Sequence, residues 1–260
     1  MNKQNTVLYP ELSYEIMGAA MDVHNQLGPG WDEETYHVAL FNALKTRGLR
    51  VESKIRGILK NHNIVADTFE LDLLVEDKIV LELKHLLGRF DPAHYIQLIN
   101  YLKFWKKDLG ILINFGMDRL HYERLPFTPR TDILKCTGAH KNLGETETIR
   151  AIFSEILNQH GLGYGTNVYK KLFQSECLFQ NIQCARPKIS LSYESVSLGT
   201  KEVDAFFTDS YALVSISAMG ENTSAVQLSR MLSYMHQTGI SPGILANFGK
   251  NELELKYVTP

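Results

Sequence analysis

The sequence predicts a protein of the α/β class, with α+β mixed sheets flanked by helices, built as two tandem copies of one unit. Apolar residues of the N-terminal half recur first with the spacing of helices and then with the alternation of strands, in the order α-α-β-β-β-α-β-β. Short segments of this half then reappear in the C-terminal half in the same order, which indicates a duplication.

Three helices are predicted in the first copy. Apolar residues at helical spacing run over residues 12–27, and the Gly28-Pro29-Gly30 cluster ends this helix. A second helix is expected over residues 32–46. The third begins at Asp91-Pro92, where an N-cap aspartate precedes a proline at the first helical position, and it continues to about Trp105.

Five strands are predicted from alternating apolar residues bounded by turns. They lie near residues 50–60, 63–75, 79–83, 109–114 and 120–125. Because Glu76-Asp77-Lys78 has the character of a tight turn, we expect the second and third strands to pair with each other.

The repeat determines the expected number of domains. Residues 25–31 resemble residues 158–164, and residues 111–116 resemble residues 244–249, each at a separation of 133 residues (158 − 25 and 244 − 111). About 115 residues per copy are enough to enclose a separate core. The expected first domain, linker and second domain are residues 1–125, 126–145 and 146–260.

The composition is that of a globular protein. Hydrophobic residues make up 44% and charged residues 22% of the 260 residues, which excludes disorder and coiled coils. The net charge of −2 gives no global attraction to nucleic acid or membranes. Three cysteines without metal-ligand spacing, and no apolar run long enough for a signal peptide or a membrane span, predict a cytoplasmic protein without a membrane partner.

Acidic residues on two neighbouring strands form the candidate site. In the strand from Ile79 to Lys84, Glu82 and Lys84 point to the face opposite the apolar residues. Asp72 lies in the preceding apolar strand. If the two strands pair through the turn between them, Asp72 and Glu82 converge.

Such a carboxylate pair repels unless a cation lies between the two groups. Hard oxygen ligands suit Mg²⁺ or Mn²⁺, which can polarise a phosphoryl oxygen and activate a bound water. Asp72 and Glu82 are then the expected metal ligands, and Lys84 orients the water or stabilises developing charge. The alternative is an exposed strand face with an ordinary Glu–Lys pair.

Two helices add further candidates. Glu33 lies three residues before Tyr36 and seven before Leu40, on the apolar face of its helix, where it can support a metal or be stabilised as a first-turn acid by the helix dipole. Gln97 and Tyr101, four residues apart, share a helix face. They could hold a phosphate or a base, or they could serve packing alone.

The stretch from Gly30 to Tyr36 forms a G-x-x-E-x-x-Y motif. Together with FELDLLVEDKIVLELKHL and YIQLINYL…LGILINFG, it makes the first copy, about residues 11–125, similar to the GxxExxY family of the PD-(D/E)xK nuclease superfamily. The resemblance implies a restriction-endonuclease-like domain in which Asp72, Glu82 and Lys84 form the D…ExK signature.

The resemblance also implies roles for the helical residues. Glu33 matches an acidic residue that assists metal binding in many members. Gln97-x-x-x-Tyr101 resembles the Q-x-x-x-Y element of RecB-type exonucleases, and we expect both residues, with Tyr36 of the first motif, to contact substrate. That group often carries an iron–sulfur cluster on four cysteines, and the three cysteines of this chain argue against one.

The second copy is predicted to be catalytically silent, because hydroxyls and one aspartate make a poor Mg²⁺ site. Asp204 is expected at the position of Asp72 after a one-residue shift, and Gln227 at that of Gln97 after a three-residue shift. The residues expected in place of Glu33, Glu82, Lys84 and Tyr101 are Thr166, Ser215, Ser217 and Met231.

The sequence therefore predicts a Mg²⁺- or Mn²⁺-dependent nuclease whose active site lies in the first copy, with DNA favoured over RNA as the substrate. The alternative is a non-catalytic module on the same scaffold that binds nucleic acid or protein. The two copies are expected to form an intramolecular pseudo-dimer, and a homo-oligomer of the chain is a further alternative.

Overall fold

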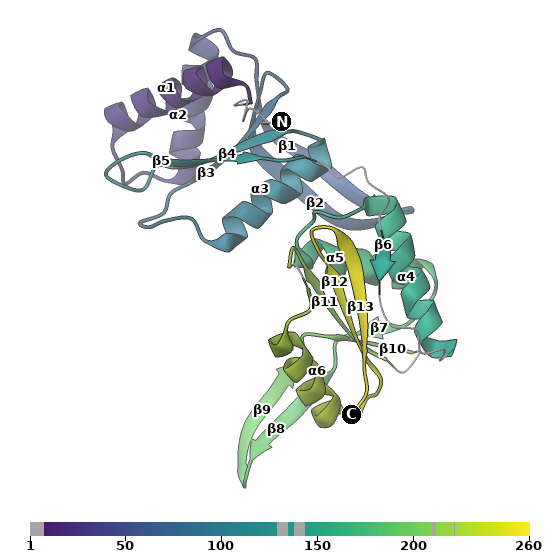
Figure 1. The fold of residues 1–260 in the computed structure, drawn as a ribbon. Coiled ribbons are helices and arrows are strands. Elements are labelled where there is room, and N and C mark those ends of the chain that lie inside the picture. The colour runs from purple at the N-terminus through teal and green to yellow at the C-terminus, as the bar shows by residue number, and fades with distance from the viewer. Residues whose placement is uncertain (1–7, 129–134, 138–143, 210–211, 221) are drawn as a thin grey trace, which may run out of the picture. The chain divides into compact units, whose positions relative to one another are not determined.

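In the computed structural model, the chain is described over residues 8–128, 135–137, 144–209, 212–220 and 222–260. It divides into two compact units. The first unit comprises residues 1–57 and 68–129, and the second comprises residues 58–67 and 130–260. Each unit is a mixed α/β structure with a mixed sheet flanked by helices, as the sequence predicts (Figure 1).

The elements of the first copy follow the predicted order. Its helices are α1 (Pro10–Leu27), α2 (Glu33–Thr46) and α3 (Pro92–Trp105). Its strands are β1 (Val51–Asn61), β2 (Ile64–Val75), β3 (Ile79–Lys84), β4 (Leu109–Asn114) and β5 (His121–Pro126), which form one sheet in that order. The β3–β4 pair is parallel, whereas β2–β3 and β4–β5 are antiparallel.

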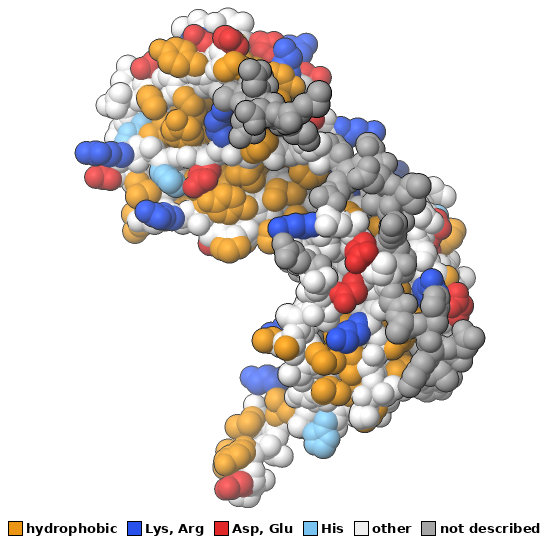
Figure 2. All heavy atoms as spheres, in the orientation of Figure 1, with side chains coloured by type: hydrophobic (Ala, Val, Ile, Leu, Met, Phe, Trp, Pro, Cys, Tyr) orange, Lys and Arg blue, Asp and Glu red, His pale blue; other side chains and the backbone are white. Residues whose placement is uncertain are grey.

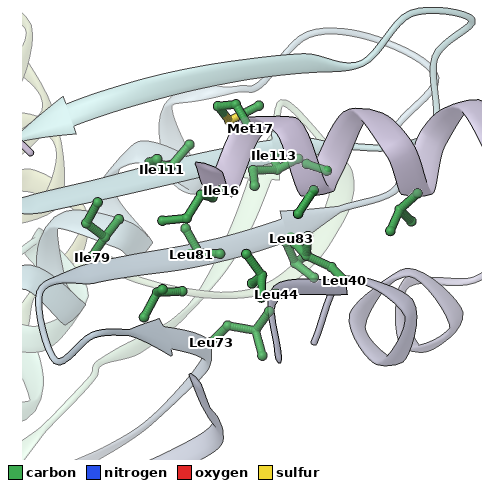
Figure 3. Close-up of a cluster of buried hydrophobic side chains, with 14 of the residues drawn as sticks. Ile16, Met17, Leu40, Leu44, Leu73, Ile79, Leu81, Leu83, Ile111 and Ile113 are labelled. Carbon is green, nitrogen blue, oxygen red and sulfur yellow. The ribbon is translucent and has the colours of Figure 1, made fainter. Parts of the chain in front are cut away.

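The sheet of the first unit is covered on both faces. Alternate residues of β3 and β4, such as Leu81 and Ile111, pack with Ile16 of α1 and Leu40 of α2 in one buried cluster (Figure 3). The intervening residues face α3, since a Cβ added at Gly110 of β4 would meet Leu98 of α3 at 2.7 Å. The side chains of Glu82 and Lys84 therefore lie on the α3 face.

The second copy repeats this frame. Its helices are α4 (Gly144–His160), α5 (Thr166–Phe179) and α6 (Ala225–Thr238). Its strands are β7 (Cys184–Ala185), β8 (Lys188–Tyr193), β9 (Val196–Glu202), β10 (Phe206–Thr208), β11 (Leu213–Ala218), β12 (Gly243–Phe248) and β13 (Glu252–Val258). The long hairpin of the first copy is here split into the β7–β10 pair within the sheet and a separate β8–β9 hairpin.

The segment predicted as a linker contains a strand. β6 (Lys135–Thr137) pairs in parallel with the start of β13 and adds a sixth strand to the sheet of the second unit. Most of the rest of the predicted linker, residues 129–134 and 138–143, lies outside the described residues. The linker prediction missed β6 because this strand forms by pairing with a distant segment of the chain. Such pairing leaves no local pattern of apolar residues in the sequence.

The second unit also contains the tip of the β1–β2 hairpin, residues 58–67. Within this unit, Asn61 donates to the buried carboxylate of Glu176 through Nδ2 at 2.7 Å, and Lys171 pairs with Asp67 at 2.6 Å. The boundaries of the two compact units therefore differ from a simple division at the linker.

Neither sign of charge dominates the face of the molecule drawn in Figure 2. On the face drawn in Figure 2, basic and acidic side chains are intermixed, in keeping with the net charge of −2. Among the helices that the structure describes, none is long and apolar enough to cross a membrane.

Candidate active site

The two predicted carboxylates lie at adjacent positions of β2 and β3. The antiparallel ladder pairs Leu73 with Leu81, so the next pair outward is Asp72 and Glu82, on the same face of the sheet. The Asp72 carboxylate accepts a hydrogen bond from the backbone N–H of Leu83 at 2.7 Å, which holds it over β3. The predicted convergence of these two carboxylates is therefore present.

Lys84 completes this group. Its Nζ donates to Oε1 of Glu82 at 2.6 Å. Glu82 is 2% exposed, and its second oxygen, Oε2, is buried without a hydrogen-bond partner. A buried carboxylate oxygen without a partner is costly in free energy, so Oε2 keeps its full capacity to accept a hydrogen bond or a cation.

The electrostatics of the pair favour a bound proton or cation. Burial, followed by repulsion from Asp72, raises the pKa of Glu82 to about 8, although Lys84 opposes the shift. Burial also raises the pKa of Asp72, opposed by the Leu83 N–H. For Lys84, burial is the largest single influence and lowers the pKa, but the carboxylates of Glu82, Glu33 and Asp72 together leave it raised. The lysine therefore stays charged, while the two carboxylates are under strain as a doubly ionised pair.

Glu33 lies within electrostatic reach of this group. It occupies the first turn of α2, whose N-cap Asp32 accepts a hydrogen bond from the Thr35 backbone N–H. The residue as a whole is exposed, yet partial burial of its carboxyl group raises the pKa, with Lys84 lowering it and Asp72 raising it. The N-terminus of α2 thus presents a third carboxylate toward Lys84 and Asp72.

Gln97 and Tyr101 are joined on α3. The Gln97 side-chain Nε2 donates to the Tyr101 hydroxyl at 2.9 Å. Burial and then the negative charge of Glu82 raise the pKa of Tyr101 to about 12. The pair therefore faces the carboxylates from the helix that covers this side of the sheet.

Tyr36 lies elsewhere and corrects one prediction. Its side chain is fully buried, its ring stacks on Phe115 at a centroid distance of 4.6 Å, and its hydroxyl donates to the Gly28 carbonyl at 2.6 Å. This bond ties α2 to the turn that follows α1. A buried ring with an occupied hydroxyl has no surface for a substrate, so Tyr36 supports the fold instead.

Three further polar residues border the site. His37 on α2 has its Nε2 3.2 Å from the Asp72 carbonyl oxygen, while its Nδ1 is buried without a partner. The buried Nε2 of His85 also lacks a partner, and its ring stacks on Tyr36 at 5.9 Å. Asn114 is paired with Lys84 across the β3–β4 ladder. Of these, the sequence points to Asn114 as part of the repeated Asn-Phe-Gly segment and to His85 as a neighbour of Lys84, but not to His37.

In the second copy, the strand register puts serines where the first copy has Glu82 and Lys84. Ser215 pairs with Leu245 as Glu82 pairs with Leu112, and Ser217 pairs with Asn247 as Lys84 pairs with Asn114. The helix position of Glu33 is taken by Thr166, the first residue of α5. These three expected equivalences agree with the register and with the helix start.

The expected match of Asp204 to Asp72 is wrong by one residue. Phe206, the first residue of β10, pairs with Val214, so continuing this register past the start of the strand would set Ala205, and not Asp204, opposite Ser215. Asp204 lies before the strand and forms an ion pair with Lys170. The irregular backbone between β9 and β10 displaces the aspartate. Alignment of the two sequences contains no information on this local backbone geometry.

The expected match of Gln227 to Gln97 is also wrong. α3 and α6 each have 14 residues and an N-terminal capping box, in which Gln227 holds the place of His94. Met231 packs against Gly243 as Leu98 packs against Gly110. Counted from the caps, the residues equivalent to Gln97, Leu98 and Tyr101 are Arg230, Met231 and Tyr234.

The residues present fit a hard divalent cation in part. Asp72, the unpartnered Glu82 Oε2 and the nearby Glu33 are oxygen donors of the kind that Mg²⁺ and Mn²⁺ prefer. No group of three or more His, Cys, Asp or Glu side chains within the described ranges is arranged closely enough to hold a metal ion by itself. A cation here would keep several water ligands, as Mg²⁺ commonly does.

Comparison with known proteins supplies the family. A sequence model described as the PD-(D/E)XK nuclease superfamily matches residues 10–125 and again residues 144–258. No curated protein matches the chain. A solved structure described as "Crystal structure of SSO0001" shares 19% identity at a TM-score of 0.29. That match covers 48% of this chain and 58% of the solved chain. Since the superfamily model covers nearly the whole sequence in two adjacent regions, the chain belongs to the PD-(D/E)XK nuclease superfamily, as a tandem pair.

Proposed function

We propose that the first copy is a Mg²⁺- or Mn²⁺-dependent nuclease of the GxxExxY type that hydrolyses phosphodiester bonds of DNA. The observation that carries the proposal is the buried Glu82 carboxylate, which has one oxygen on Lys84 and the other without a partner beside Asp72. Nothing in the fold requires such a costly arrangement, whereas a cation-binding site does.

Four residues of the first copy would have distinct roles in the reaction. Asp72 and Glu82 would bind the cation, and Glu33 would support it through water from the start of α2. A bound Mg²⁺ would polarise a phosphoryl oxygen and lower the pKa of a water molecule. The Lys84 ammonium, fixed by Glu82 at 2.6 Å, would orient the attacking water and stabilise charge on the phosphate.

The substrate would lie between α3 and the end of β3. Gln97 and Tyr101 offer an amide and a phenol on the side of α3 that faces Glu82, where they can contact a phosphate or a base. With a net charge of −2, these local contacts rather than a general positive field would have to bind the nucleic acid.

The second copy would be silent. Its equivalents of Asp72, Glu82 and Lys84 are an alanine and two serines, which offer no carboxylate to a cation. A covalently linked inactive copy can act as the second half of a pseudo-dimer without the concentration dependence of a homodimer.

Cleavage of single-stranded, duplex and branched DNA, and of RNA, with and without Mg²⁺ or Mn²⁺ tests the proposal. We expect Glu82→Gln and Lys84→Met to lower cleavage by about 10³-fold or more. The matched control is Ser215→Ala with Ser217→Ala at the equivalent positions of the second copy, which should cleave as the wild type does. Equal activity of wild type and Glu82→Gln would exclude this site.

Calorimetry with Mn²⁺ separates this proposal from the alternative of a non-catalytic binding module. Binding by the wild type that Glu82→Gln abolishes supports the metal site. Nucleic-acid binding without any metal binding or cleavage would favour the non-catalytic module.

A further inference from the structure

The loop between Lys84 and α3, residues 85–91, carries the most exposed large apolar side chain among the described residues. Leu87 is 93% exposed and is followed by the exposed residues Gly88 and Arg89. Leu87 is the third residue after Lys84, and the same loop leads into the helix that bears Gln97 and Tyr101. The loop therefore directly connects the strand that carries Glu82 and Lys84 to the helix that covers them.

The loop is held in place by a buried asparagine. Asn114 is fully buried, and its Oδ1 accepts from the backbone N–H groups of Leu86 at 2.8 Å and Gly116 at 3.0 Å. Its Nδ2 donates to the carbonyl groups of Leu86 at 3.1 Å and Gly88 at 2.9 Å. All four bonding positions of the amide are used, and three of the bonds hold the residues on either side of Leu87.

Close packing fixes the same segment a second time. A Cβ at Gly116 would lie 2.6 Å from backbone atoms of Leu86, so the chain after Asn114 touches the loop directly. At the far end, Phe90 is buried and stacks on His121 at a centroid distance of 5.2 Å. An exposed leucine on a segment anchored this firmly is a preformed projection that loses little conformational freedom when it binds.

The second copy lacks this projection. By the strand register, Lys84 corresponds to Ser217, so Leu87 corresponds to Gly220, which has no side chain. The equivalent asparagine is kept, but Asn247 accepts from the Ser217 hydroxyl at 3.1 Å, and its buried Nδ2 has no partner. The second copy, which also lacks the carboxylates, therefore has no counterpart of the exposed Leu87. Among its described residues it also has no counterpart of the clamp, by which we mean the three Asn114 bonds to Leu86 and Gly88.

We propose that Leu87 is a wedge that inserts between neighbouring bases of duplex DNA bound at the Asp72–Glu82–Lys84 site. Apolar side chains of this size unstack base steps in other DNA-binding proteins and so kink the duplex. The wedge favours DNA that bends or unstacks easily at the cleavage site, and it makes Leu87 a residue that determines substrate specificity. This inference rests on the proposed nuclease function for the location of the DNA.

Fluorescence of 2-aminopurine tests the insertion directly. The full chain is mixed with Ca²⁺ and short duplexes that carry 2-aminopurine at successive positions. We expect the wild type to raise the fluorescence at one or two adjacent positions by about threefold or more through unstacking. Leu87→Ser should abolish this rise, and Leu87→Phe should retain it. The control is Tyr14→Ser, at a 78% exposed aromatic on α1, which should behave as the wild type does.

Cleavage kinetics give the second measurement. Leu87→Ser should lower kcat/KM by about 10- to 100-fold on a fully paired duplex and by less than about threefold on a duplex with a mismatch at the unstacked step, because the mismatch supplies the unstacking. Equal losses on both substrates, or no loss on either, would overturn the wedge.

The two proposals fail in different ways. If Glu82→Gln cleaves as the wild type does, the proposed active site is wrong, and the fluorescence assay alone decides the wedge. If the wild type cleaves but produces no change in fluorescence at any position, the nuclease function stands and the wedge is wrong.

Discussion

The two copies share a frame but differ at the candidate site. In both, a buried tyrosine donates to a glycine carbonyl at 2.6 Å, Tyr36 to Gly28 and Tyr169 to Gly161, and stacks on the phenylalanine of the Asn-Phe-Gly segment. The buried Glu82 of the first copy is a half-buried serine, Ser215, in the second. The duplicated frame is thus independent of the carboxylates, and few side chains separate the copies chemically.

The largest expected effect comes from rebuilding the site in the second copy. With the first copy inactivated by Glu82→Gln, the change Ser215→Glu with Ser217→Lys should leave cleavage at the inactive level, about 10³-fold or more below wild type. Ala205 still occupies the place of Asp72, so only one carboxylate is present. Further addition of Ala205→Asp should produce measurable metal-dependent cleavage, and cleavage without it would contradict the assigned register.

A smaller difference is expected between the stability costs of removing the two equivalent asparagines, Asn114 and Asn247. Asn114→Ala removes four hydrogen bonds and leaves buried backbone groups unsatisfied, which should cost about 3 kcal/mol. Asn247→Ala should cost about 1 kcal/mol, because its Nδ2 has no partner to lose. Hydrogen exchange, followed separately for the amides of each copy, measures the free energy of unfolding of each one, since the two units need not unfold together. Equal costs would mean that the clamp contributes nothing to stability.

The pH dependence of stability should distinguish the carboxylate site. The folded pKa of Glu82, about 8, lies above the ordinary value of 4.5, so between these values the folded chain keeps a proton that the unfolded chain has released. The contribution of Glu82 to stability is therefore lost as pH rises through this window. In metal-free buffer, urea unfolding should show wild type losing about 2–4 kcal/mol relative to Glu82→Gln between pH 5 and pH 8. A pH-independent difference would argue against a strongly raised pKa.

The smallest expected effect is a loss of stability of equal size in the two copies. Tyr36→Phe and Tyr169→Phe each remove the hydroxyl that reaches a glycine carbonyl and leave the ring stack in place. Each should cost about 1 kcal/mol in its own copy, measured by hydrogen exchange. If Tyr36→Phe also lowered kcat/KM for the substrate without loss of stability, the assignment of Tyr36 to the fold would be wrong.

Local signals explain what the sequence could predict. Helices α2 and α3 begin after Asp32 and Asp91 because the side chains of these residues cap the backbone, and cap residues of this kind can be recognised in the sequence. Strand alternation and one tight turn were enough to bring Asp72 next to Glu82. The same alternation of side chains along a strand predicts that Glu82 and Lys84 lie on one face of the sheet.

Nonlocal features could not be predicted in this way. The match of Gln227 to Gln97 followed shared letters, whereas the helix cap shows that Gln227 serves the start of α6. Asn114 belongs to a repeated segment, but its three bonds to a loop 26–28 residues away depend on the folded chain. The strand within the predicted linker likewise exists only through its partner.

That strand, β6, bears on how the chain can be divided. The superfamily match of the second copy begins at residue 144, yet β6 at Lys135–Thr137 pairs with Glu252–Glu254 of β13. A fragment cut at the start of the match would leave the outer side of β13 unpaired, and an unpaired strand edge invites association with other chains. A soluble, separately expressed second copy should therefore begin before residue 135, even though this adds residues that no family motif includes.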